Sequence, residues 1–292
     1  MKIGLIDIDG HNFPNLALMK ISAFHKQKGD NVEFYSIFGK YDIVYKSKVF
    51  TFSQEYPHYI NNSELVVSGG TGYKMYNNNL KNEIEHIMPD YSLYNEKKAY
   101  GFLTRGCPNK CNWCVVPKKE GAIVENADIT EFWTGQKETI LMDNNVLAHE
   151  HGLKQIEKII DLGIKIDFNQ GLDARIIAEN KQIAELLSKV KWSKYIRLAC
   201  DTKAQIPYIS KTVELLNKFG LKNYKIFVYT LVKDIDDAIE RIYFMRNLGI
   251  KPFAQPYQDF EKNIKPTKEQ KRLARWTNHK AIFNTVEFAD YR

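Results

Sequence analysis

The chain has 292 residues, of which 44% are apolar, and 42 basic residues against 35 acidic ones give a formal net charge of +7. This length and composition suit a globular protein with one large α/β domain and a smaller partner, and no apolar run approaches the length of a membrane span. Four cysteines leave no disulfide framework and the N-terminus does not read as a signal peptide, so we expect a cytoplasmic protein.

Residues 1–95 are predicted to form a small Rossmann-like α/β domain. The apolar cluster Lys2–Asp7 is typical of a buried parallel strand, and Pro14 opens an amphipathic helix. Further strands are expected at Asn31–Tyr35 and at Leu65–Ser68, where glycines follow. A polar, turn-rich stretch before residue 96 marks the boundary.

Residues 96–258 are predicted to alternate between strand and helix. Strands are expected at Tyr100–Thr104, Thr139–Asp143, Lys165–Asn169, Tyr195–Cys200, Lys225–Thr230 and Pro252–Ala254. Helices are expected at Ile129–Thr134, Gly152–Asp161, Ile176–Val190, Tyr208–Phe219 and Ile235–Leu248. About six such units suit a partial (β/α)6 barrel better than a closed eightfold one. Residues 259–292 then form a basic C-terminal helical extension.

One loop carries three of the four cysteines. It reads GFLTRGCPNKCNWCVVPKKEG from Gly101 to Gly121 and places Cys107, Cys111 and Cys114 in a C-x3-C-x2-C spacing. Soft thiolates suit an iron–sulfur cluster or zinc, and three protein ligands leave one coordination position open. A zinc knuckle or three unligated cysteines are the alternatives, although no histidine lies near the loop to complete a zinc site.

With Trp113 before its last cysteine, this loop resembles the cluster loop of the radical S-adenosylmethionine superfamily. The resemblance implies that the three cysteines hold three irons of a [4Fe–4S] cluster and that S-adenosylmethionine binds the fourth. It also implies an external flavodoxin- or ferredoxin-like electron donor and a 5′-deoxyadenosyl radical that abstracts hydrogen from the substrate. A non-catalytic iron–sulfur module that binds nucleic acid is the competing class.

Polar residues recur where the predicted barrel strands end, which is where ligands collect in parallel α/β proteins. The resemblance implies that Trp113 packs on the adenosyl group, and it places an S-adenosylmethionine-binding turn at the end of the second strand. The candidate cofactor contacts at the strand ends are Asp143, Asn144, Asn169, Arg175, Arg197 and Asp201. The plainer interpretations are an Asx turn at Asp143, a surface arginine at 175 and an ion pair between Arg197 and Asp201.

Cys200 falls on the opposite face of its strand from Arg197 and Asp201, among apolar residues. We expect it to be a buried structural thiol, with a redox or substrate role as the alternative.

The N-terminal region is similar to a shortened cobalamin-binding domain, on its helix PNLALMKISAFHKQKG and the strand end VVSGG. The cobalt-binding signature of such domains is not reproduced around His11, which we interpret as a turn residue. We therefore expect no cobalamin, and a cobalamin-dependent radical methyltransferase is the alternative.

The stretch CVVPKKEG is similar to the loop of methylthiotransferases that modify transfer RNA or a ribosomal protein. Those enzymes carry further N-terminal cysteines and an RNA-binding domain that this sequence does not show, so we do not expect methylthiolation.

The C-terminal extension is rich in cations: Lys262, Lys265, Lys268, Lys271, Arg272, Arg275 and Lys280. Its helix is expected to dock by an aromatic side that includes Trp276 and to direct Lys268, Arg272 and Arg275 outward. A solvated basic face explains this pattern, and so does an electrostatic guide for a nucleotide or nucleic-acid substrate.

Overall fold

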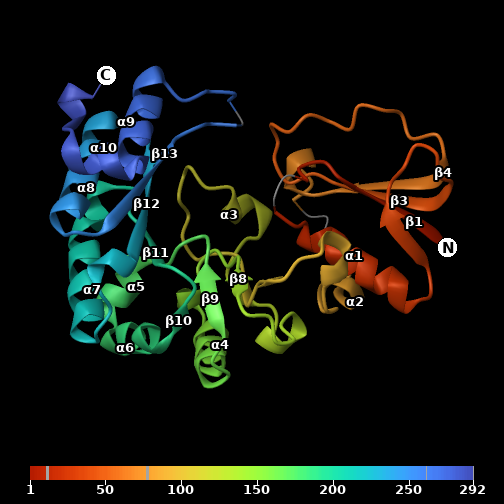
Figure 1. The fold of residues 1–292 in the computed structure, drawn as a ribbon, viewed down its shortest axis with the longest axis horizontal. Coiled ribbons are helices and arrows are strands. Elements are labelled where there is room, and N and C mark those ends of the chain that lie inside the picture. The colour runs from red at the N-terminus through yellow and green to blue at the C-terminus, as the bar shows by residue number, and fades with distance from the viewer. Residues whose placement is uncertain (11–12, 77–78, 261, 292) are drawn as a thin grey trace.

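The computed structural model describes residues 1–10, 13–76, 79–260 and 262–291 and shows an α/β protein with parallel sheets (Figure 1). His11 lies outside the described residues. The longer helices are α1 (Leu16–Gln27), α4 (Glu150–Asp161), α5 (Ala174–Glu179), α6 (Lys181–Lys189), α7 (Ile206–Lys218), α8 (Ile235–Asn247), α9 (Lys268–Asn278) and α10 (Lys280–Thr285). Single-turn helices are α2 (Asn82–Glu85) and α3 (Val116–Lys119). None of the helices in these ranges is long and apolar enough to cross a membrane.

The N-terminal sheet is parallel and has the order β2-β1-β3-β4. Its strands are β1 (Lys2–Asp7), β2 (Asn31–Phe34), β3 (Tyr41–Ser47) and β4 (Ser63–Gly69). Asn15 caps α1 by accepting a hydrogen bond from the Leu18 amide at 3.2 Å, and α1 then packs on the apolar side chains of β1. Strand β3 was missing from the sequence prediction, because its polar residues break the apolar pattern.

The remaining parallel strands form two sheets. One has the order β10-β9-β8-β5 and the other β11-β12-β13. Their strands are β5 (Ala99–Gly101), β8 (Thr139–Leu141), β9 (Lys165–Phe168), β10 (Lys191–Trp192), β11 (Ile196–Ala199), β12 (Ile226–Val232) and β13 (Lys251–Pro256). A parallel bridge between Leu172 and Leu198 joins the two sheets. Every strand predicted for this region is present, and β10 is an additional short one.

Two predicted helices differ from the structure. The predicted helix Ile176–Val190 is interrupted at Asn180, whose side chain accepts hydrogen bonds from the amides of Gln182 and Ile183 and so starts α6 separately from α5. The predicted helix Ile129–Thr134 is only a short 3-10 turn. It starts at a capping box formed by Asp128 and Glu131 and ends at Phe132, whose φ of −136° is not helical.

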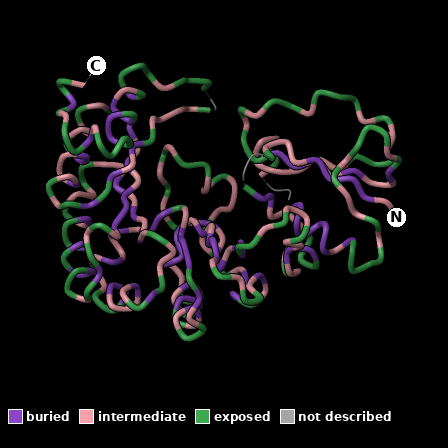
Figure 2. Tube along the Cα trace, viewed as in Figure 1, coloured by how far each residue is buried: buried purple, intermediate pink, exposed green. Residues whose placement is uncertain are grey.

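The main core lies between the strands and the helices that cover them, as the buried segments along β8, β9 and β11–β13 show (Figure 2). Leu141, Phe168, Leu198 and Val228 belong to it and are essentially inaccessible. Cys200 is fully buried in the same core, and burial raises the pKa of its thiol to about 12. The predicted burial of Cys200 is therefore confirmed.

Helix α9 starts at a capping box in which the Gln270 amide donates to Thr267 Oγ1 at 3.1 Å. Trp276 is fully buried, as predicted, and its ring packs against Phe283 and Phe288. The prediction for Arg272 is wrong. Its guanidinium is half-buried and lies 4.4 Å from the centre of the Phe288 ring, because position 272 faces the segment that follows α10.

Candidate cluster and cofactor site

The cysteine-bearing loop is closed by a short antiparallel ribbon of β6 (Thr104–Arg105) and β7 (Val124–Glu125). Gly106 enters the loop with a φ of +79°, and a Cβ atom there would lie 2.2 Å from the Ala122 carbonyl oxygen. Only glycine tolerates both conditions, so the chain can turn tightly just before Cys107.

The three cysteines share this loop but differ in exposure. Cys107 and Cys111 are half-buried and Cys114 is exposed, and the Cys114 amide donates to the Cys111 carbonyl at 3.1 Å. Burial and the neighbouring thiols raise the pKa of Cys111, and burial likewise raises that of Cys114.

Cysteine thiolates bind either a single metal ion or an iron–sulfur cluster, and the two need different arrangements of donors. Over the described ranges, no three His, Cys, Asp or Glu side chains stand close enough to hold a single metal ion. A [4Fe–4S] cluster makes a different demand, because each cysteine binds its own iron. The donors present are therefore soft thiolates on one loop, and polar groups from β8 and α5 lie beside them.

Glu120 joins the two ends of the loop and was missed from the sequence. Its side chain is 6% exposed, accepts hydrogen bonds from the Gly106 amide and from Asn144 Nδ2, both at 2.9 Å, and pairs with Arg105 at 3.1 Å. Asn144 is thus held by Glu120. The only sequence signal for this role was an acid within the lysine-rich stretch KKEG.

Asp143 ends β8 inside the protein. Its Oδ1 accepts hydrogen bonds from the Thr104 amide at 2.6 Å and the Thr104 hydroxyl at 2.8 Å. Its Oδ2 is buried and has no hydrogen-bond partner within the described part of the chain. Burial raises the pKa of this carboxyl to about 6.

A second polar network ties the cysteine loop to β8 and α5. Asp173 Oδ2 accepts from Asn109 Nδ2 at 3.1 Å and from Asn145 Nδ2 at 3.5 Å, and Asn145 Nδ2 also lies 3.7 Å from Cys107 Sγ. Asp173 caps α5, as predicted, and holds the Arg175 guanidinium with two hydrogen bonds of 2.9 and 2.6 Å. Burial opposes ionisation of Asp173, but these bonds together lower its pKa.

Arg197 belongs to a third group. It forms a two-pronged pair with Asp167, with distances of 2.6 and 2.7 Å, and donates to the Tyr229 hydroxyl at 3.0 Å. Tyr229 in turn donates to the Asn169 carbonyl at 2.9 Å. The alternative of an Arg197–Asp201 pair is wrong, because Asp167 on the adjacent strand end takes the guanidinium.

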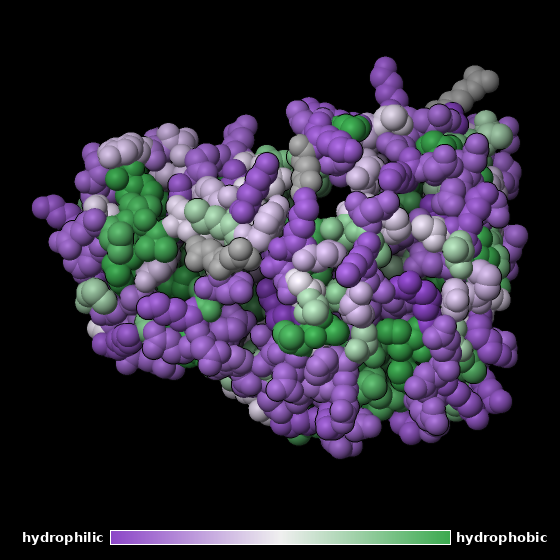
Figure 3. Space-filling view, turned by 180° about the vertical axis from the view of Figure 1, so that it is seen from behind, coloured by the Kyte–Doolittle hydropathy of each residue, from purple (hydrophilic) through white to green (hydrophobic). Residues whose placement is uncertain are grey.

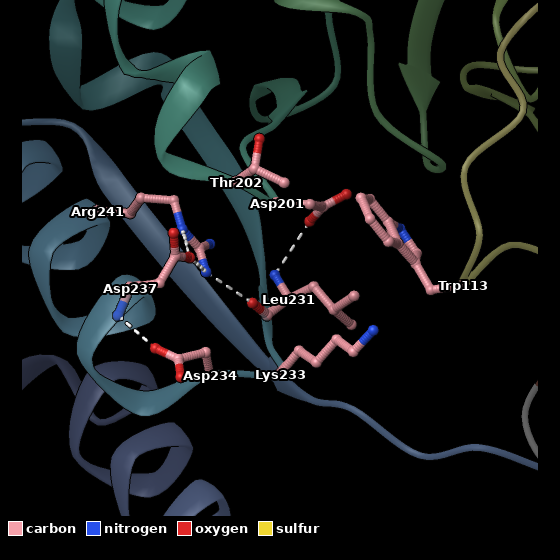
Figure 4. Close-up of a pocket in the computed structure, with 8 residues that line it drawn as sticks. All are labelled: Trp113, Asp201, Thr202, Leu231, Lys233, Asp234, Asp237 and Arg241. Carbon is pink, nitrogen blue, oxygen red and sulfur yellow. Dashed lines mark hydrogen bonds and ion pairs between the residues drawn. The ribbon is translucent and has the colours of Figure 1, made fainter.

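Asp201 instead lines a cavity of about 410 Å³ opposite Trp113 (Figure 4). Its Oδ1 accepts from the Leu231 amide at 3.0 Å, and burial raises the pKa of the carboxyl. The other lining residues are Thr202, Leu231, Lys233, Asp234, Asp237 and Arg241. The cavity thus brings an aromatic ring of the cysteine loop next to the carboxyl ends of β11 and β12.

Arg241 forms one wall of this cavity and was also missed. Its guanidinium is buried and donates to the carbonyls of Cys200 at 2.7 Å and Leu231 at 3.0 Å, while Asp237 provides the counter-charge. The Asp237–Arg241 spacing on a helix predicts an ion pair, but burial of the Arg241 guanidinium follows from the tertiary structure alone.

The fold and site define an α/β protein whose C-x3-C-x2-C loop lies at the carboxyl ends of parallel strands, beside a polar cavity. The chain is similar to the tRNA-2-methylthio-N(6)-dimethylallyladenosine synthases of two Clostridium botulinum strains, Eklund 17B and Alaska E43, with 25% identity over 274 residues in each case. The alignment covers 90% of this chain and 58% of each relative, so the chain spans less than two thirds of their length. No family model matches the sequence.

Proposed function

We propose that the chain is a radical S-adenosylmethionine enzyme that modifies a nucleic-acid substrate. The observation that carries the proposal is the placement of Cys107, Cys111 and Cys114 on a tightly closed loop at the carboxyl ends of β5 and β8. The distant similarity to synthases whose name specifies a modified tRNA supports both the chemistry and the substrate class. In this proposal residues 96–258 form a partial (β/α)6 barrel, preceded by the domain 1–95 and followed by the extension 259–292.

The three cysteines would hold a [4Fe–4S] cluster, which supplies the electron for cleaving S-adenosylmethionine to methionine and a 5′-deoxyadenosyl radical. A flavodoxin- or ferredoxin-like donor would reduce it. Asn145 donates toward Cys107 Sγ and fixes the first cysteine against β8. Trp113 and Asp201 face the cavity, where an adenosyl group would find a ring to stack on and a carboxylate to accept hydrogen bonds.

The other candidate residues contribute in different ways, according to the hydrogen bonds that each already makes within the protein. The unpartnered Asp143 Oδ2 is available to an ammonium group, whereas Asn144 supports the site through Glu120. Arg175 can bind a carboxylate only by giving up part of its contact with Asp173. Asn169 and Arg197 hold the neighbouring strand ends in place through Tyr229 and Asp167.

Anaerobic reconstitution tests the proposal. The protein should bind about four irons, and strong reductant with S-adenosylmethionine should give 5′-deoxyadenosine. Cys111→Ala should abolish that product, whereas Cys200→Ala, which removes a cysteine from the core, should retain it. A colourless protein with stoichiometric zinc, or product formation by Cys111→Ala, would contradict the proposal. A cluster without any S-adenosylmethionine turnover would favour the non-catalytic module.

Cobalamin has no part in the proposal. A stoichiometric corrinoid absorbance in protein expressed with added cobalamin would overturn this and favour a cobalamin-dependent radical methyltransferase.

A further inference from the structure

A basic groove lies between α9 and the end of β13. It has a volume of about 480 Å³ and is lined by Pro256, Lys271, Ala274, Arg275, Asn278 and His279. Lys271 and Arg275 are four residues apart and share one face of α9, and His279 follows directly as its C-cap. The Asn278 side chain donates to the Ala254 carbonyl and accepts from its amide, both at 2.9 Å. The helix is therefore fixed to β13, and the groove has a rigid floor.

The basic side chains of this groove have no acidic partner among the described residues. In the portion of the chain that the structure describes, neither Lys271 nor Arg275 forms an ion pair, and both are exposed. On the neighbouring α8, by contrast, Arg246 pairs with Glu287 at 2.9 Å. Two free cations on one face of a hollow attract an anion and hold it near the helix.

A stack of exposed aromatic rings is formed by two residues that follow β3 and one that follows β13. Phe50 and Phe52 follow β3, and their ring centres are 5.1 Å apart at an angle of 17°. Phe52 in turn lies 5.4 Å from Phe260 at 24°, and the three residues are 50%, 63% and 46% exposed. Phe260 follows Pro256 of the groove by four residues, so at most about 14 Å of chain separates them. Figure 1 shows the segment after β13 reaching from α9 toward the N-terminal sheet.

Exposed apolar surface also occurs elsewhere, but without this combination. From behind, the surface is mainly hydrophilic with apolar patches on both halves (Figure 3). The edge strand β4, for example, exposes Leu65 and Val66. These aliphatic side chains offer no flat ring, whereas stacked phenylalanines beside free cations match the two features that single-stranded nucleic acid requires.

We infer that the α9 groove and the Phe50–Phe52–Phe260 stack together bind a single-stranded stretch of the nucleic-acid substrate. The groove cations contact phosphates, and the exposed ring faces of the stack receive an unpaired base. This inference rests on the nucleic-acid class proposed above and assigns it a surface outside the cysteine loop and its cavity.

Fluorescence anisotropy with a labelled single-stranded RNA oligonucleotide, measured anaerobically on the full chain between about 50 and 200 mM salt, tests the groove. The double variant Lys271→Glu, Arg275→Glu should weaken binding at least tenfold. The plot of log affinity against log salt should also become less steep, with a slope less negative by about 1.4, because two phosphate contacts are lost. Lys218→Glu with Lys222→Glu is the matched control, since both lysines are exposed and the change in net charge is the same.

A second pair of variants tests the aromatic stack in the same binding experiment. Phe52→Leu keeps an apolar side chain but removes the ring, and should weaken binding about five- to tenfold without changing the salt slope. Phe38→Leu, at an exposed phenylalanine outside the stack, should leave binding unchanged.

Equal losses in the groove and control double variants would overturn the inference, and so would unchanged binding by either Phe52→Leu or the groove variant. If the unmodified protein binds no RNA at low salt while it still forms 5′-deoxyadenosine, the nucleic-acid class fails and the radical chemistry stands. If RNA binding follows the inference but no 5′-deoxyadenosine forms, the radical chemistry fails and the surface stands.

Discussion

Asn145 Nδ2 lies 3.7 Å from Cys107 Sγ. Because Asn145 lies just after β8, the end of this strand is in direct contact with the first cysteine of the loop. The same amide reaches Asp173 Oδ2 at 3.5 Å. One buried side chain therefore sets the position of the loop relative to both a strand and a helix.

Replacing Asn145 by leucine should make the reduction potential of the cluster more negative. The amide donor stabilises the more reduced, more negatively charged state, and loss of about 1 kcal/mol of hydrogen bonding corresponds to about 40 mV for one electron. A redox titration followed by electron paramagnetic resonance measures the shift. Asn62→Leu, in the N-terminal unit, is the control, and equal potentials in the unmodified protein and Asn145→Leu would refute the contact.

Asp173→Asn should reduce iron retention with little loss of stability. Asparagine still caps α5, but it releases the Arg175 guanidinium and weakens the tie to Asn109. Iron content after desalting, together with the urea midpoint, checks this. The matched control is Asp128→Asn, because Asp128 also combines a cap with a lysine pair but lies away from the loop. Similar iron loss in both variants would show a general effect of weakened caps.

Asp143 should make stability fall as the pH rises from about 4 to about 6. Its pKa is raised by burial from 3.8 to about 6, so in this range the folded state binds more protons than the unfolded state. The contribution is present at low pH and is lost as the pH passes the folded pKa, and it amounts to at most about 3 kcal/mol. Urea unfolding at a series of pH values should show this trend as the difference between the unmodified protein and Asp143→Asn. A difference independent of pH would mean that folding does not shift the pKa of this carboxyl.

Arg197→Met should lower the free energy of unfolding by about 3 kcal/mol, because it leaves the buried Asp167 carboxylate without its partner. Adding Asp167→Leu should recover most of that loss, since no charge then remains unpaired. Denaturant titrations of the two single variants and the double variant give the coupling energy. Strictly additive losses would show that the pair does not act as a unit.

Much of this architecture was readable from the residue pattern. The strands of residues 96–258 follow from apolar runs separated by amphipathic helices, and the cysteine loop follows from its spacing. The partners of the polar residues did not follow, because Arg197 had two acids within reach and only the strand register selects Asp167 over Asp201. Glu120 and Asn145 were missed for a related reason. Their roles depend on the tertiary contacts that form when the cysteine loop folds back on itself. No periodic pattern in the local sequence predicts those contacts.

The two walls of the Trp113–Asp201 cavity are built very differently. On one side the guanidinium of Arg241 joins α8 to the ends of β11 and β12, whereas on the other side Trp113 is carried by a loop. Admission of a ligand should therefore be governed by the loop, and the strand wall should act as a fixed template. Hydrogen exchange should show slow amide protons at Leu231 and faster ones around Trp113, with protection of the latter when the cavity is filled.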